Sequence, residues 1–170
     1  MQTTDEQYGL GAIMNIALDR AFMFSPISFC IENDMIMHKD LDILKYIDLM
    51  LNTNIGNIGF RYYIQSSHKC NLRMFSYDGH QYVIPFPENQ SDIGYPVDFG
   101  QNMFSQQFIS RIGKFAENDN AADAVERRFV ESYAKQLNDK DHMLKAYDLQ
   151  YFHQRMNDER GVFYHIGIYS

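Results

Sequence analysis

The Asp78-Gly79 pair lies between two runs of alternating side chains, and it constrains the fold more than any other feature of the chain. A two-residue hairpin turn requires positive φ angles at its central positions, and an Asp-Gly pair adopts them readily. Residues 70–77 precede the pair. Residues 81–84 follow it before Pro85, which is expected to end the strand because proline has no backbone N–H to donate. The sequence therefore predicts an antiparallel hairpin here.

A third strand is predicted just upstream, over residues 58–64. Ile58, Phe60 and Tyr62 alternate there with the residues between them, in the period of two that is typical of a strand with one buried face. Together with the hairpin, this strand forms a predicted three-stranded antiparallel meander over residues 57–86. Because three strands alone bury too little apolar surface to be stable, helices are expected to cover one face of the meander.

Apolar residues recur at helical spacing in five further stretches. These predicted helices span residues 4–22, 40–51, 103–112, 121–137 and 141–156. Gly9 and Gly11 weaken the first turns of the first helix, which favours a start near Ala12. In the fourth helix Phe129 and Tyr133 lie one turn apart on the apolar side, so both are predicted to be buried.

Three short strands complete the predicted elements. Residues 27–31 and 35–37 follow the first helix, and the alternating run 162–168 is predicted as a strand that could join the edge of the sheet. No internal repeat or low-complexity segment separates these elements, so no linker between domains is expected. The predicted fold is a single α+β domain of residues 1–170.

The composition excludes several classes of protein. The chain has 170 residues, of which 45% are hydrophobic, which is enough for a packed core and excludes a disordered protein. No stretch approaches the roughly 20 apolar residues that a membrane helix needs, and the N-terminus lacks the basic start of a secretion signal. We therefore expect a cytoplasmic protein without membrane contact, whose Cys30 and Cys70 stay reduced.

The charge balance disfavours nucleic acid as a partner. Fifteen Lys and Arg residues against 22 Asp and Glu residues give a net charge of -7, which repels phosphate backbones and disfavours direct binding of nucleic acid. Such a charge serves solubility, or it suits a partner with a positively charged face. Residues 87–100 are predicted to form a long surface loop, and its carboxylates Glu88, Asp92 and Asp98 are the candidate partner contacts.

Catalytic candidates are few. His80 beside Asp78 could form an acid–base pair, and Cys70 with His68 could form a thiolate–imidazole pair, although turns and strand ends often carry such residues without any chemistry. His142 and His153 would stand ~16 Å apart on the last predicted helix, which is too far to share a metal ion. The sequence predicts no metal site and no cofactor, which favours a binding or inhibitory protein.

Six motifs, taken in order, resemble those of the ArdB/KlcA antirestriction proteins. They are Phe24-Ser25-Pro26, the helix at 41–51, the strand at 57–63, the turn, strand and proline at 78–85, Met103-Phe104-Ser105, and the aromatic helix at 129–137. The resemblance covers residues 21–139 and leaves 140–170 as an additional helix and strand. Phe60 stands where the family tends to have Trp, and the segment between the first strand and Pro85 is longer here.

The resemblance implies both a fold and an activity. Members of this family are small acidic α+β proteins of plasmids, phages and other mobile elements, and they are understood to block type I restriction enzymes without imitating DNA. It therefore implies a non-enzymatic inhibitor that acts by protein contact, although no individual functional residue is carried over. Two other hypotheses remain open from the residues alone: an immunity or adaptor protein that neutralises a toxin, and a small hydrolase built around His80 or Cys70.

Overall fold

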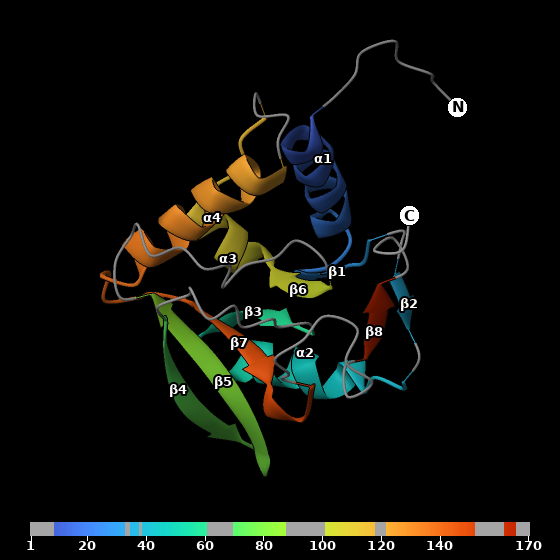
Figure 1. Ribbon diagram of the computed structural model, residues 1–170, viewed down its shortest axis with the longest axis vertical. Coiled ribbons are helices and arrows are strands. Elements are labelled where there is room, and N and C mark those ends of the chain that lie inside the picture. The colour runs from blue at the N-terminus through green and yellow to red at the C-terminus, as the bar shows by residue number, and fades with distance from the viewer. Residues whose placement is uncertain are drawn as a thin grey trace.

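The computed structural model describes residues 9–32, 35–37, 39–60, 70–87, 101–117, 122–151 and 162–165. Figure 1 shows how the elements of these residues are arranged. The helices are α1 (Leu10–Phe22), α2 (Ile43–Asn52), α3 (Gln106–Ile112), α4 (Ala122–Gln136) and the short 3-10 helix η1 (Leu149–Tyr151). The strands are β1 (Ile27–Cys30), β2 (Met35–Met37), β3 (Ile55–Gly59), β4 (Cys70–Tyr77), β5 (His80–Pro87), β6 (Asn102–Ser105), β7 (Leu144–Asp148) and β8 (Phe163–His165).

The main sheet has six strands in the order β1-β6-β3-β7-β5-β4. The pair β3 and β7 is parallel, and the remaining neighbours are antiparallel. The α+β class is thus confirmed, but the predicted three-stranded meander is wrong, because β7 lies between β3 and the hairpin. The first strand was predicted over residues 58–64 with one buried face, whereas β3 spans Ile55–Gly59 and every residue of it is buried, as in a strand that is covered on both faces. Residues 61–64 lie outside the described residues.

The predicted hairpin is confirmed. Asp78 and Gly79 have φ angles of 46° and 76°, as a two-residue turn of this kind requires, and Tyr77 pairs with His80 across it. Pro85 does not end the strand, since it pairs with Leu72 and β5 continues to Pro87. Hydrogen-bonded and non-hydrogen-bonded pairs alternate outward from the turn, and Pro85 falls on a non-hydrogen-bonded pair, where its missing N–H is not needed.

Helices cover both faces of the sheet, whereas one covered face was predicted. Tyr46, Leu49 and Met50 of α2 pack into one hydrophobic cluster, and residues of α1, α3 and α4 pack into another. Figure 1 shows α1, α3 and α4 grouped at the top of the view, away from α2. The neighbouring residues Met103 and Phe104 of β6 belong to different clusters, because successive side chains of a strand point to opposite faces.

Two of the predicted helices contain strands. Residues 102–105 form β6, and α3 begins only at Gln106, where the hydroxyl of Ser105 caps the helix by accepting from the N–H of Phe108 at 3.1 Å. The predicted helix at 141–156 is also wrong, because residues 144–148 form β7 and are all buried. Leu144 and Tyr147 have helical spacing, but a strand buried on both faces accommodates the same apolar residues.

The other predicted elements are largely confirmed. α1 and α4 lie within the predicted helices, but α1 begins at Leu10 and not near Ala12. α2 begins at Ile43, with Asp42 as its N-cap, and ends at Asn52, one residue beyond the predicted end. β1 and β2 match the two short strands to within one residue. The C-terminal strand exists as β8, but it pairs with β2 in a separate two-stranded sheet and not with the edge of the main sheet.

Phe129→Ala should destabilise the protein strongly. Phe129 is 2% exposed, and its ring stacks on Phe115 with centroids 4.4 Å apart. Removing the ring leaves a cavity among the aromatic side chains of α3, α4 and β6, at a cost of about 3 kcal/mol in the free energy of unfolding. Urea denaturation measures this loss, with Glu131→Ala on the exposed side of α4 as the control. Equal midpoints for the two variants would contradict the burial of Phe129.

Candidate functional site

The candidate residues from the sequence lie in different parts of the chain. Glu88, Asp92, Asp98 and His68 lie outside the described residues, as does His153. Cys70 is the first residue of β4. Asp78 lies in the hairpin turn and His80 begins β5. His142 lies between α4 and β7 and not on a helix, so the helical spacing assumed for the two histidines does not apply.

Asp78 and His80 line a common pocket of about 520 Å³ between α2 and the β4–β5 hairpin. We call this the acidic pocket, because four aspartates line it: Asp40, Asp42, Asp48 and Asp78. The remaining lining residues are the tyrosines Tyr46, Tyr77 and Tyr151, together with Leu44, Lys45, His80 and Gln150. The three segments that meet here lie far apart in the sequence.

A buried carboxylate fixes the inner side of the pocket. Asp148, at the end of β7, is 3% exposed, and its Oδ2 accepts from the ammonium of Lys45 and from the hydroxyl of Tyr46, each at 2.7 Å. Its Oδ1 accepts from the backbone N–H of Gln150 at 2.9 Å. Because these bonds satisfy both oxygens, they join α2 to β7 without leaving a buried charge unpaired. The position of α2, and with it one wall of the pocket, depends on Asp148.

Hydrogen bonds and burial also determine the protonation state of the tyrosines that line the pocket. Burial, followed by the negative charge of Asp148, holds the pKa of Tyr46 far above its usual value. The same two causes raise the pKa of Tyr151. The hydroxyl of Tyr77 donates to Oδ2 of Asp48 at 2.8 Å, which raises the pKa of Tyr77. The hydroxyls therefore stay protonated at neutral pH, and the aspartates give the pocket its negative charge.

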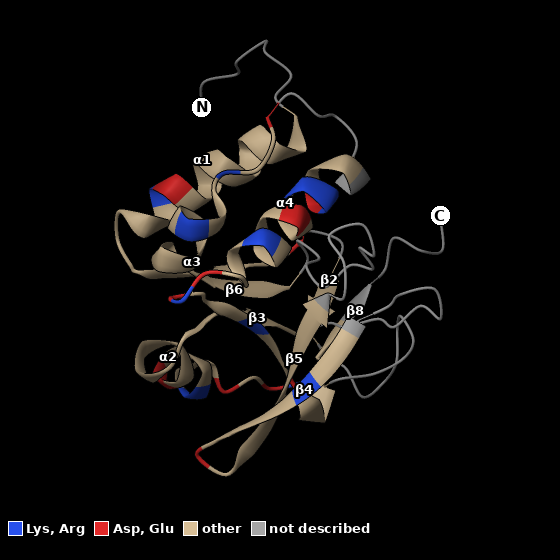
Figure 2. Cartoon of the chain, turned by 90° about the vertical axis from the view of Figure 1, so that its left-hand side faces the viewer, with Lys and Arg blue, Asp and Glu red and all other residues tan. Residues whose placement is uncertain are grey.

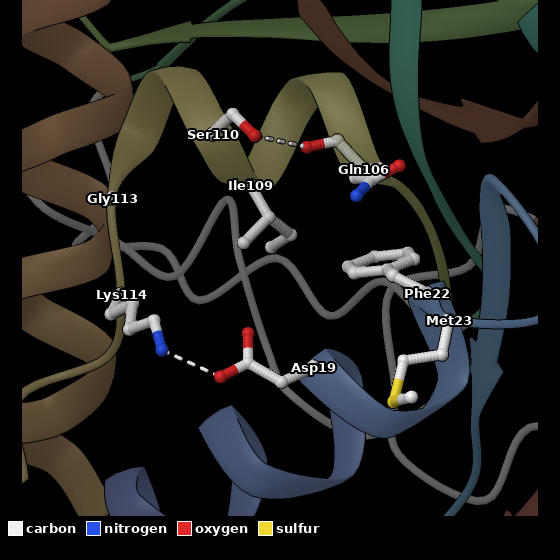
Figure 3. Close-up of a pocket in the computed structure, with 8 residues that line it drawn as sticks. All are labelled: Asp19, Phe22, Met23, Gln106, Ile109, Ser110, Gly113 and Lys114. Atoms are coloured by element: carbon white, nitrogen blue, oxygen red, sulfur yellow. Dashed lines mark hydrogen bonds and ion pairs between the residues drawn. The ribbon is translucent and has the colours of Figure 1, made fainter.

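A second hollow, of about 300 Å³, lies between α1 and α3 (Figure 3). Asp19 and Lys114 form an ion pair at its side with an N–O distance of 2.6 Å, and both side chains are more than half exposed. Exposed ion pairs of this kind contribute little. Met23, which is 78% exposed, lines the same hollow. The charges here balance one another, so this hollow offers less for recognition than the acidic pocket does.

Lys145 is a buried cation with a structural role. It is fully buried in β7, and its ammonium donates to Oδ1 of Asn57 in β3 and to Oδ1 of Asn102 in β6. The ammonium also lies 4.7 Å from the ring centroid of Tyr147. A Cβ at Gly59 would lie 2.3 Å from the Tyr147 ring, so glycine is required for this close approach. These bonds hold three strands together.

No local sequence pattern marks Lys45, Tyr46 and Asp148 as members of the site. Lys45 and Asp148 are 103 residues apart, and no local pattern links them. Within the described ranges, no three His, Cys, Asp or Glu side chains lie close enough together to hold a metal ion. None of the helices in the described ranges has the length and apolar composition of a membrane span.

Tyr46→Phe should change how stability depends on pH. Unfolded tyrosine loses its proton near pH 10.0, whereas folded Tyr46 keeps it to a higher pH, so deprotonation of the unfolded chain lowers stability above pH 10. At pH 7 the variant should be less stable by about 2 kcal/mol, because the bond to Asp148 is lost. This deficit should shrink by about 1.4 kcal/mol per pH unit above pH 10. Urea unfolding from pH 7 to 11 measures both values, and a deficit that does not change with pH would contradict the raised pKa.

Comparisons of the chain with protein-family models, with curated proteins and with solved structures found no match.

Proposed function

We propose that this protein is a non-enzymatic inhibitor of a type I restriction system, and that it acts by protein contact through the face that carries the acidic pocket. The observation that supports this proposal is the convergence of four aspartates from two distant parts of the chain on one pocket. The resemblance to the ArdB/KlcA proteins suggests the target. An acidic face suits contact with a positively charged patch on a protein partner, and such contact requires no imitation of DNA.

The charge on this face suits association with a basic partner. Lys45 is already bound to Asp148, so it does not neutralise the aspartates at the rim. Figure 2 shows Asp and Glu residues on α2 and at the tip of the β4–β5 hairpin. A surface of one charge sign speeds the association of a partner of the opposite sign and sets its orientation.

Apolar side chains adjoin the aspartates. Leu44 and Leu51 of α2 are 75% and 64% exposed, and Leu44 also lines the pocket. Protein interfaces bury such apolar groups at their centre and surround them with polar residues. We infer that α2 and the hairpin tip together form the contact face. Glu88, Asp92 and Asp98, which lie outside the described residues, remain contacts predicted from the sequence alone.

One observation favours a second candidate function, a small hydrolase. Asp78 and His80 line the same pocket, so both side chains can reach a molecule bound there. The two functions differ in their dependence on His80. An inhibitor that acts by contact needs no general base, whereas a hydrolase built on this pair loses its activity when the imidazole is removed.

Expression of the protein should raise the plating efficiency of unmodified phage on a strain with a type I restriction system. The double variant Asp40→Lys/Asp78→Lys should protect less, because it reverses rim charges but retains the cap at Asp42 and the bond from Tyr77 to Asp48. The matched control is Asp19→Lys/Glu131→Lys, which changes the net charge equally at residues of α1 and α4. Equal loss in both variants would show that only net charge matters.

Single alanine changes separate the hypotheses. His80→Ala and Cys70→Ala should each leave protection intact if the protein acts by contact, because contact needs no general base or nucleophile, whereas Asp78→Ala removes one charge of the contact face and should weaken protection slightly. Loss of protection in His80→Ala or Cys70→Ala, with an unchanged circular dichroism spectrum, would favour a hydrolase. Unchanged plating with the wild-type protein would remove the restriction target and favour a toxin-neutralising protein. The variant with Glu88, Asp92 and Asp98 changed to Lys should also weaken protection, as the sequence predicts.

A further inference from the structure

β4 lies at one edge of the main sheet. It pairs with β5 on one side, and within the described residues no strand pairs with its other side. Figure 1 shows β4 at the outer end of the sheet. β4 has eight residues, whereas β1 at the opposite edge has only four. A long edge strand offers a row of backbone N–H and C=O groups to a further strand.

The register of the hairpin determines which backbone groups lie on the open side of β4. Tyr77 and His80 flank the two-residue turn, and the residues in these positions form a hydrogen-bonded pair. Hydrogen-bonded and non-hydrogen-bonded pairs then alternate along the hairpin. The N–H and C=O groups of every second residue of β4 therefore point away from β5. These residues include Leu72, Met74 and Ser76.

The side chains of β4 do not protect this edge. Proteins usually block an edge strand with lysine, proline or a bulge. β4 contains no lysine or proline, and its register with β5 is continuous. Its one charged residue is Arg73, whose guanidinium lies 3.9 Å from the ring centroid of Phe86 in β5. Leu72 and Met74 are 42% and 57% exposed, so the edge combines open backbone groups with exposed apolar side chains.

We propose that β4 pairs antiparallel with β4 of a second copy of this chain, with the two Met74 residues opposite each other on a two-fold axis. In this register Leu72 of one copy lies opposite Ser76 of the other. The residues whose backbone groups point to the open side therefore bind one another, through about six hydrogen bonds between the chains. The two sheets become one continuous sheet, and α2 of both copies lies on the same face of it.

The side chains of β4 complement those of a second β4 in this register. Arg73 lies opposite Phe75 of the other copy, and a guanidinium beside an aromatic ring is a favourable contact. An axis at Arg73 would instead place two like charges directly opposite each other. β4 has no acidic residue, and the Asp78 residues of the two copies lie at opposite ends of the strand pair, so the net charge of -7 opposes this contact little. Two-fold pairing is also the commonest symmetry of homo-oligomers.

Sedimentation analysis of the full-length protein over a concentration series tests the pairing. The mass of the wild-type protein should rise from that of one chain to that of two. Met74→Pro removes an N–H that points to the open side, so it should raise the dissociation constant of the dimer at least about tenfold and leave the bonds between β4 and β5 in place. A wild-type protein that stays monomeric up to about 1 mM would overturn the proposal.

A charged variant tests the same edge without a change to the backbone. Met74→Lys places two ammonium groups opposite each other and should also raise the dissociation constant at least about tenfold. Met23→Lys is the matched control, because Met23 is 78% exposed at the α1–α3 hollow and the net charge changes equally. The urea midpoint of each variant verifies its fold. Equal weakening by the two lysine variants would overturn the proposal, since association would then not depend on β4.

Cysteine crosslinking tests the register. In a variant with Cys30 and Cys70 changed to Ser, Met74→Cys should form a disulfide between the chains, because directly opposite residues have Cα atoms about 5.5 Å apart. Leu72→Cys and Ser76→Cys should each crosslink poorly alone and readily when the two variants are mixed. Absence of the Met74→Cys disulfide, at concentrations where the mass of the wild-type protein doubles, would overturn the proposed pairing.

Discussion

The five buried residues of β7 hold the two halves of the sheet together. β7 pairs in parallel with β3 on one side and antiparallel with β5 on the other, so the hairpin joins the rest of the sheet through this strand. The side chains of β7 make polar contacts on both faces of the sheet. Lys145 reaches Asn57 and Asn102 on one face, and Asp148 binds Lys45 and Tyr46 of α2 on the other. Layers that would otherwise pack only through apolar contacts are thereby fixed in register.

The polar bonds of β7 add specificity to the apolar packing. Hydrophobic packing has no direction, whereas a buried charge is tolerated only when its partners lie at the correct distance and angle. Asp148 must meet Lys45 and Tyr46, so α2 can take only one position along the sheet. The same bonds neutralise Lys45, and they leave the aspartates of the pocket rim to set the charge of this face.

The negative charge and the pocket therefore lie on the same face of the protein. The rim of the acidic pocket combines carboxylates with tyrosine rings, and exposed leucines of α2 adjoin it. These properties support the proposed contact with a positively charged protein partner. The hollow between α1 and α3 has exposed apolar groups as well, but its Asp19 and Lys114 bind each other. The two hollows thus differ in how much charge remains for a partner.

The sequence by itself determined the elements whose signals are local. The Asp78-Gly79 turn specified the hairpin, and apolar periodicity specified α2 and α4 with the burial of Phe129 and Tyr133. Only the tertiary structure decided which strands are neighbours. β7 is buried on both faces, so its apolar residues show no clear alternation, and the sequence predicted a helix there. Local sequence patterns also did not predict the pocket, although Asp78 and His80, which both line it, were predicted as a pair. Asp148 is 103 residues from Lys45 in the sequence, and only the tertiary structure brings these two residues together.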